Sequence, residues 1–189
     1  MYRDQMRRYA ATMIAAAALL ALPGTSQIAQ EQKPPALPLP EMQRLSKLYV
    51  GTWSYSETYP KSKFLPNGGV NTGVYTSELG PGGNSIINRF HSQGPVGDFE
   101  GLLVMTWDPG EKAYKEYVFS GDSPVPLVET GQWEGDVLIY RAEIPLGARK
   151  MALRNASRFL EGGKLVSDQF SSMNGAPETL FVHVEAVKK

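Results

Sequence analysis

The sequence contains no cysteine and only two histidines among its 189 residues. The missing cysteines exclude disulfide bonds, thiolate metal sites, cysteine nucleophiles and a lipid anchor attached through cysteine. His91 and His183 lie far apart, and neither has a second histidine at the spacing typical of metal sites. The chain also lacks a Gly-x-Ser-x-Gly segment, which would mark the serine elbow of a hydrolase. We therefore expect no metal ion and assign no catalytic residue.

Long apolar runs are also scarce. The apolar run at residues 9–22 follows three arginines and precedes a Pro-Gly break and small residues, which is the layout of a secretory signal peptide. Its 14 residues are too few for a permanent membrane-spanning helix. We predict a signal peptide over residues 1–29, a periplasmic or extracellular location, and no stable membrane span after cleavage. An uncleaved N-terminal anchor is the alternative.

The chain has no marked excess of charge of either sign. Lysine and arginine total 19, as do aspartate and glutamate. Without residues 1–29 the balance is 16 basic to 18 acidic side chains, or a net charge of about −2. This balance offers no general attraction for nucleic acid or for an anionic membrane, so we expect neither as a partner.

Residues 30–40 contain four prolines and predict an extended tether before a domain at 41–189. Pro40 suits the first turn of a helix, and Met42, Leu45 and Leu48 or Tyr49 then form an apolar stripe at helical spacing. A helix of about two turns is too short to be stable alone in water. It must therefore pack on the segments that follow it.

From residue 50 onward, nine turn signals rich in Gly, Asn, Asp and Pro separate segments enriched in aromatic and β-branched residues. Within these segments apolar residues alternate with others: Tyr114, Glu116 and Val118 share one face, opposite Tyr117. Ten consecutive antiparallel strands would leave exposed edges unless the sheet closed. The sequence therefore predicts an all-β fold, an antiparallel up-and-down barrel of about ten strands with the short helix closing one end. The turn signals lie at residues 66–69, 80–83, 93–95, 108–110, 121–124, 134–136, 145–147, 161–163 and 174–175.

The segment Val50-Gly51-Thr52-Trp53, preceded by a Leu-x-x-Leu helix, resembles the glycine-x-tryptophan motif of the calycin (lipocalin-like) superfamily. Residues 107–109 with Tyr114, and the stretches 131–136 and 174–177, resemble an uncharacterised family of exported bacterial lipocalin-like domains of unknown function. The resemblance covers roughly residues 42–187 and implies a barrel whose floor is closed at Gly51 and Trp53.

Lipocalins usually stack an arginine from the last strand on the motif tryptophan. The last strand of this chain ends instead in Lys188 and Lys189. Arg154 or Arg158 from an earlier strand could take the place of that arginine.

Aromatic residues with polar tips suit a cavity that binds an apolar molecule and orients it by a few hydrogen bonds. For any one of these residues, ordinary barrel packing is the competing interpretation. We expect the ligand to be a small apolar or aromatic molecule. The candidate ligand-binding residues are Tyr75, Trp107, Tyr117, Trp133 and Tyr140.

Two acidic pairs, Glu129 with Glu134 and Asp98 with Glu100, could serve acid–base chemistry if buried together. Related nitrobindin-type barrels ligate haem iron through one histidine, which would be His183 in this chain. His183 shares a strand face with Glu185, opposite the apolar face, so an ordinary strand histidine is favoured and we expect no cofactor.

Three functions remain open after the sequence. The first is an exported protein that binds a small, mainly apolar molecule in the barrel. The second is an enzyme of isomerase or lyase type, which requires at least two ionisable groups that converge inside the barrel. The third is an envelope interaction protein whose barrel interior is filled.

Overall fold

The computed structural model describes residues 38–63, 65–121 and 123–189. The predicted signal peptide and most of the predicted tether lie outside these ranges. The described residues form one α-helix, one 3-10 turn and ten strands, and no helix among them is long and apolar enough to cross a membrane. The elements are α1 (Pro40–Tyr49), β1 (Gly51–Tyr59), β2 (Gly69–Leu79), η1 (Pro81–Gly83), β3 (Ser85–Gly94), β4 (Gly97–Asp108), β5 (Ala113–Ser120), β6 (Leu127–Glu134), β7 (Val137–Leu146), β8 (Arg149–Leu160), β9 (Lys164–Met173) and β10 (Thr179–Lys188).

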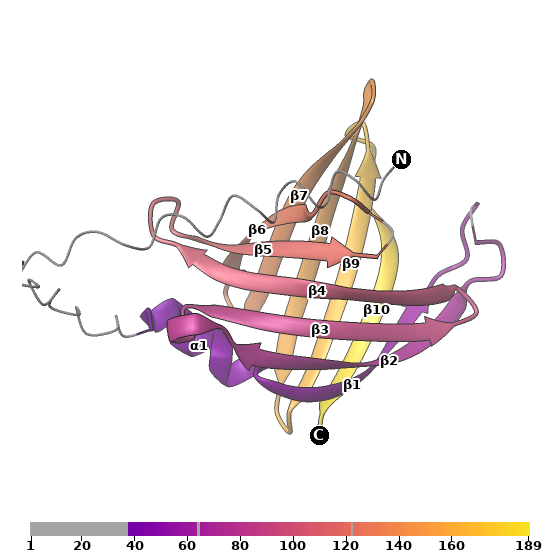
Figure 1. Cartoon of the computed structure of the whole chain (residues 1–189). Coiled ribbons are helices and arrows are strands. Elements are labelled where there is room, and N and C mark those ends of the chain that lie inside the picture. Colours follow the sequence, from indigo (N-terminus) through magenta and orange to yellow (C-terminus); the bar gives the residue numbers. More distant parts are fainter. Residues whose placement is uncertain (1–37, 64, 122) are drawn as a thin grey trace, which may run out of the picture. The chain divides into compact units, whose positions relative to one another are not determined.

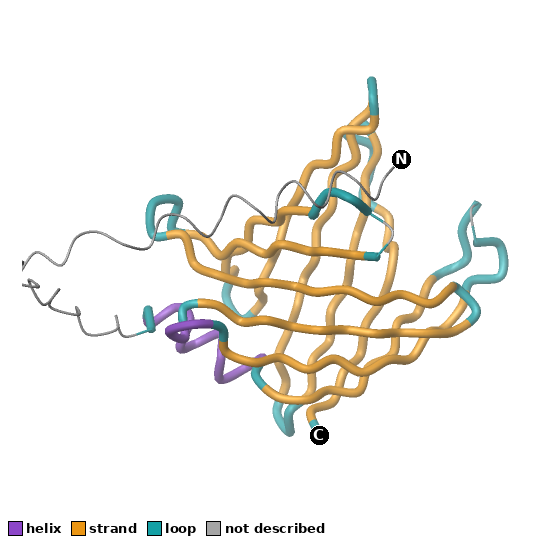
Figure 2. The backbone as a smooth tube through the Cα atoms, in the orientation of Figure 1, coloured by secondary structure: helices purple, strands orange, loops and turns teal. Residues whose placement is uncertain are grey.

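The ten strands form a closed antiparallel barrel (Figure 1). Each strand pairs with its neighbours along the chain, and β1 pairs with β10 to close the sheet. All nine predicted turn segments lie at the connections between consecutive strands. Figure 2 draws loops and turns in teal and helices, which include η1 between β2 and β3, in purple. The predicted all-β, up-and-down barrel of about ten strands is therefore confirmed.

Helix α1 lies at the end of the barrel where β3 begins and β4 ends (Figure 1). Pro40 occupies its first turn, as predicted, and Met42, Leu45 and Tyr49 are its buried residues. This apolar stripe packs against a core that includes Ile86, Met105, Tyr114, Leu138 and Tyr140. The helix thus buries its stripe by closing one end of the barrel, which is the predicted arrangement.

Trp53 forms the junction between α1 and the barrel wall. Its side chain is 1% exposed, and its Nε1 donates a hydrogen bond of 2.9 Å to the carbonyl oxygen of Tyr49. The Trp53 ring stacks on Tyr75 with a centroid separation of 5.6 Å. Gly51, two residues before Trp53, has a φ of 137°, which residues with a side chain rarely adopt. A Cβ at this position would lie 2.7 Å from Cε of Lys188. Both motif residues therefore belong to the floor of the barrel.

Lys188 provides the cation above Trp53. Its Nζ lies 5.3 Å from the centre of the Trp53 ring, and the two residues are direct cross-strand partners between β10 and β1. The suggestion that Arg154 or Arg158 fills this role is wrong. Arg154 instead forms a bidentate ion pair with Glu178, because the β9–β10 connection places that carboxylate beside it.

Lys188→Met is expected to lower the free energy of unfolding by about 0.5 to 1 kcal/mol, since it removes a cation–π contact and keeps most of the aliphatic stem. The Nζ of Lys188 also donates a long hydrogen bond of 3.4 Å to the carbonyl oxygen of Leu48. Urea denaturation measures the change. The exposed neighbour provides the control: Lys189→Met should change stability by less than about 0.5 kcal/mol. Equal effects of the two substitutions would show that the contact with Trp53 contributes nothing.

Candidate functional site

A cavity of about 750 Å³ occupies the barrel interior. It extends from Tyr49 at the α1 end to Asp98 and Phe99, which follow the β3–β4 turn at the opposite end. Apolar and aromatic side chains supply more than half of its lining, and the polar residues are interspersed among them. The aliphatic and phenylalanine residues of the lining are Phe90, Phe99, Leu103, Met105, Val118, Leu127, Leu153, Leu165, Phe170, Phe181 and Val184.

Phe181 reaches this lining through a β-bulge. Strand alternation predicts that Phe181 lies on the face opposite Val182 and Val184. The register between β10 and β9 shifts between Leu180 and Val182, so Phe181 has no direct partner. The bulge changes the direction of its side chain, and Phe181 lines the cavity together with Val184.

One polar wall of the cavity satisfies its own hydrogen bonds. Ser157 donates a bond of 3.0 Å to Oγ of Ser167, and the hydroxyl of Ser167 donates to Oδ1 of Asn155. These residues lie on β8 and β9, whose register brings Ser157 and Ser167 directly opposite each other. This wall needs no ligand to complete its hydrogen bonding.

Other buried polar atoms of the cavity have no partner. The hydroxyls of Tyr55 and Tyr75 and the Oδ1 of Asn88 are inaccessible and make no hydrogen bond among the described residues. All three residues line the cavity and are at most 8% exposed. Burial also raises the pKa of Tyr55 to about 12, so its hydroxyl stays protonated at neutral pH and can donate. Unpartnered buried polar groups are rare in native proteins, and a bound molecule is one way to satisfy them.

Glu116 and Glu129 form an acidic pair inside the barrel. They are direct cross-strand partners on β5 and β6, each is 6% exposed, and both line the cavity. Burial raises the pKa of both carboxyls, and the charge on Glu129 raises the pKa of Glu116 further. Two adjacent buried carboxyls favour sharing one proton over ionising together.

Tyr140 lies beside this pair. Its side chain is 1% exposed, and its hydroxyl has no hydrogen-bond partner among the described residues. Burial raises the pKa of Tyr140, and the charge on Glu116 raises it further. A Cβ on Gly131 would overlap the Tyr140 ring, so this glycine is what lets the tyrosine lie flat against β6.

The five predicted ligand-binding residues lie in different places. Tyr75 lines the cavity, and Tyr140 packs in the core next to Glu116. Tyr117 lies between Glu116 and Val118, which both line the cavity, so strand alternation turns Tyr117 to the outer face. The two tryptophans lie beside α1, as described next.

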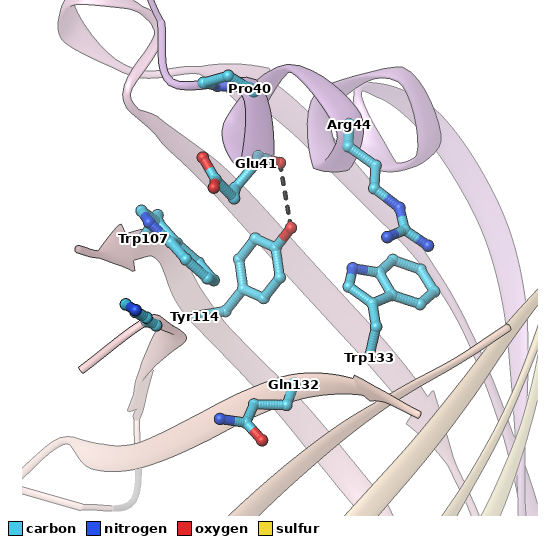
Figure 3. Close-up of a pocket in the computed structure, with 8 residues that line it drawn as sticks. Pro40, Glu41, Arg44, Trp107, Tyr114, Gln132 and Trp133 are labelled. Atoms are coloured by element: carbon cyan, nitrogen blue, oxygen red, sulfur yellow. Dashed lines mark hydrogen bonds between the residues drawn. The ribbon is translucent and has the colours of Figure 1, made fainter. Parts of the chain in front are cut away.

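Trp107 and Trp133 line an open groove of about 450 Å³ beside α1 (Figure 3). The Cζ of Arg44 lies 3.9 Å from the centre of the Trp133 ring. The rings of Trp107 and Tyr114 meet edge to face, with their centres 4.9 Å apart. The Tyr114 hydroxyl donates a bond of 3.2 Å to the carbonyl oxygen of Glu41. These contacts attach the helix to the ends of β4, β5 and β6.

The acidic pairs considered from the sequence do not form. Glu134 is ion-paired with Arg141 at 2.8 Å, and Asp98 is bonded to His91 at 2.7 Å. Glu129 meets Glu116 instead, because the β5–β6 register places them opposite each other. The sequence carries a signal for this pair. Glu116 lies on the apolar face of its strand, and in a hairpin centred on the turn at residues 121–124 it lies as far from the turn as Glu129 does.

His183 lies on the face of β10 opposite Val182 and Val184. Its Nδ1 is 2.7 Å from Oδ1 of Asp168, and its side chain is about one-third exposed. No group of three or more potential metal ligands occurs within residues 38–63, 65–121 and 123–189. The histidine is thus engaged by a carboxylate on the adjacent strand.

The chain is similar in structure to a protein known from the crystal structure of Rv2717c from M. tuberculosis. The two share 16% sequence identity with a TM-score of 0.56, over 80% of this chain and 99% of that chain. No protein-family model matches the sequence, and neither does any curated protein. At this identity the likeness shows the fold alone, so the comparison supports the barrel and assigns no function.

Proposed function

We propose that this protein is an exported, lipocalin-like barrel that binds a small, mainly apolar molecule in its cavity without transforming it. The observation that carries the proposal is the cavity of about 750 Å³ inside the barrel. Small-molecule sites in proteins have volumes of about 300 to 1,000 Å³. Barrels of more than about eight strands have interiors that side chains do not fill, and this barrel has ten.

The lining supports a ligand with an apolar body and a few polar atoms. Apolar side chains such as Phe90, Leu103 and Val184 offer contact area, and the atoms without hydrogen-bond partners on Tyr55, Tyr75 and Asn88 offer fixed polar contacts. This combination of apolar surface and few directed polar groups is typical of ligand cavities. A filled barrel would leave no such space, which disfavours the interaction-protein alternative.

The apolar run of residues 9–22, which follows three arginines, supports export, because this layout is typical of a secretory signal peptide. Such a signal would direct the mature protein to the periplasm or outside the cell. The balanced charge favours neither nucleic acid nor an anionic membrane as a partner. We assign no haem, because the Nδ1 of His183 is held by Asp168 on the face of β10 opposite Val184. N-terminal sequencing of the mature protein would test the predicted cleavage.

Val118→Trp is expected to weaken binding of 1-dodecanol, a neutral apolar probe, by at least about tenfold, or 1.4 kcal/mol. Val118 lines the cavity, and the larger side chain takes up the space that the ligand needs. The matched control is Val128→Trp, because Val128 is 46% exposed and lies on the adjacent strand outside the lining. Isothermal titration calorimetry measures both affinities, and thermal unfolding confirms that both variants are folded.

Two results would contradict the proposal. One is that the unmodified chain binds neither 1-dodecanol nor other small apolar molecules. The other is that Val118→Trp and Val128→Trp weaken binding equally, which would place the ligand outside the barrel.

Glu116 and Glu129 support a second candidate, an isomerase or lyase that transfers a proton inside the barrel. They are two ionisable groups that converge in the cavity, and burial raises the pKa of both. A ketone probe separates the candidates, because proton transfer would exchange its α-protons. Faster exchange of 2-tetralone protons in D2O with the unmodified chain than with E116Q/E129Q would favour the enzyme. Equal exchange would favour binding alone.

A further inference from the structure

We propose that Glu116 and Glu129 bind the protonated amine of an amphiphilic ligand whose apolar part fills the rest of the cavity. This inference rests on the proposed function and narrows the ligand to a chemical class: a cationic amine with an apolar body. Three features of the cavity favour such a ligand: the charges of its lining, its buried acceptors without partners and its aromatic rings.

The charges that line the cavity are mainly negative. Among the described lining residues five are acidic and one, Arg154, is basic. Two of the acidic residues, Asp98 and Glu100, are exposed at the end opposite α1, and Asp98 is bonded to His91. Arg154 is neutralised by its bidentate ion pair with Glu178. Glu116 and Glu129 form no ion pair with any described lysine, arginine or histidine. The buried acidic pair therefore lacks a cation that the protein itself could have supplied.

A second observation is independent of these charges. The Oδ1 of Asn88 and the hydroxyl oxygens of Tyr55 and Tyr75 lie in the cavity without partners, and each residue is more than nine-tenths buried. The hydroxyl of Tyr140, beside Glu116, is also without a partner. The Oδ1 of Asn88 can only accept, and each hydroxyl oxygen can accept as well as donate, so a ligand that brings N–H donors can satisfy these atoms; an ammonium group brings three.

Aromatic rings add to the attraction for a cation. Tyr49, Tyr55 and Tyr75 line the cavity, and the rings of Tyr55 and Tyr75 are 5.6 Å apart. The faces of such rings attract ammonium groups, more strongly when the cation is desolvated. Tyr49 lies close enough to Glu116 for the carboxyl charge to raise its pKa further above the level set by burial. The carboxyl pair and the Tyr49 ring thus lie in the same part of the cavity.

The protonation of the acidic pair fits this role. Burial and mutual repulsion favour one shared proton, which leaves about one negative charge on the pair. A bound ammonium group offsets that charge and donates hydrogen bonds to both carboxyls. A ligand carboxylate would meet repulsion at the same place, and a neutral alcohol would gain only ordinary hydrogen bonds.

The test uses three probes with the same apolar chain: dodecylamine, 1-dodecanol and dodecanoic acid. Calorimetric titration of the full chain at pH 7.5 is expected to show that dodecylamine binds about 10- to 100-fold tighter than 1-dodecanol. Dodecanoic acid should bind more weakly than the alcohol. In E116Q/E129Q the amine and the alcohol should bind within about threefold of each other, because the charge that separates them is gone. The control is Glu134→Gln, outside the cavity, which should leave the order unchanged.

The outcomes separate this inference from the function on which it rests. If none of the three probes binds, the proposed function fails and the amine site fails with it. If 1-dodecanol binds but dodecanoic acid binds as tightly as dodecylamine, only the amine site is wrong. A preference for the amine that survives in E116Q/E129Q would also overturn it. The order of the three affinities, measured on the unmodified chain, decides between these outcomes even if the double variant does not fold.

Discussion

Trp53→Ala is expected to lower the free energy of unfolding by about 3 to 5 kcal/mol, the range for removing a large aromatic side chain from a core. Trp53 is 1% exposed and stacks on Tyr75 at 5.6 Å. Its Nε1 also donates to the carbonyl oxygen of Tyr49, the last residue of α1. The substitution removes the packing between helix and wall and leaves that buried carbonyl oxygen without its donor.

Urea denaturation of the variant and of the unmodified chain measures this loss. The matched control is Trp107→Ala, because Trp107 is only partly buried and packs on the core from the groove beside α1. It should cost clearly less than Trp53→Ala. If Trp53→Ala left the melting temperature unchanged and abolished binding of 1-dodecanol, Trp53 would be a ligand contact and not part of the floor.

The architecture of the barrel can be predicted from the sequence because turn residues and the alternation of apolar and polar residues along a strand are local properties. Each of the nine connections carries residues that tight turns require; Gly135, for example, adopts φ 65° between β6 and β7. The stripe of Met42, Leu45 and Tyr49 predicts a buried helix face in the same way. Closure follows from the number of strands and the need to pair the edges of the first and last.

The candidate site is harder to predict from the sequence because it depends on which residues of different strands lie opposite each other. Pairing Glu129 with Glu116 requires the register of β5 against β6, and the acidic residue nearest in sequence, Glu134, points to Arg141 instead. Lys188 above Trp53 depends likewise on the pairing of the two chain-distant strands β1 and β10. Phe181 enters the cavity through a bulge that alternation does not predict.

Tyr117 and Trp133 show why residue type alone does not identify a cavity residue. Residue type makes each a reasonable ligand contact, yet Tyr117 faces outward and Trp133 packs under Arg44 beside α1. Aromatic residues with polar tips serve walls, floors and helix contacts equally well. Among them only the three-dimensional arrangement separates Tyr75, which lines the cavity, from the others.

The buried acidic pair makes stability depend on pH. The carboxyls of Glu116 and Glu129 have folded-state pKa values raised above their ordinary value of 4.5, mainly by burial. Between pH 4.5 and the raised values the folded state therefore binds more protons than the unfolded state. Stability then falls as the pH rises through this window, and the pair contributes no such change below it.

E116Q/E129Q is accordingly expected to be more stable than the unmodified chain at pH 8 by about 1 to 3 kcal/mol, the usual cost of a poorly satisfied buried polar group. At pH 4 the two proteins should have similar stability. Urea denaturation between pH 4 and pH 9 measures the difference. Tyr49 and Tyr140, which surround Glu116, have pKa values raised above 10 and do not titrate in this range.

Glu134→Gln is the matched control for this prediction, because Glu134 is about half exposed and paired with Arg141 on the outside. Glu134→Gln should show the same fall in stability above pH 4.5 as the unmodified chain. Glu178, whose pKa is lowered by Arg154, titrates at lower pH in all three proteins and cancels from the comparison. If E116Q/E129Q kept the same dependence on pH, the two carboxyls would be solvated in the folded protein. The negative charge on which the proposed amine site depends would then be screened by water, and the preference for dodecylamine should disappear with it.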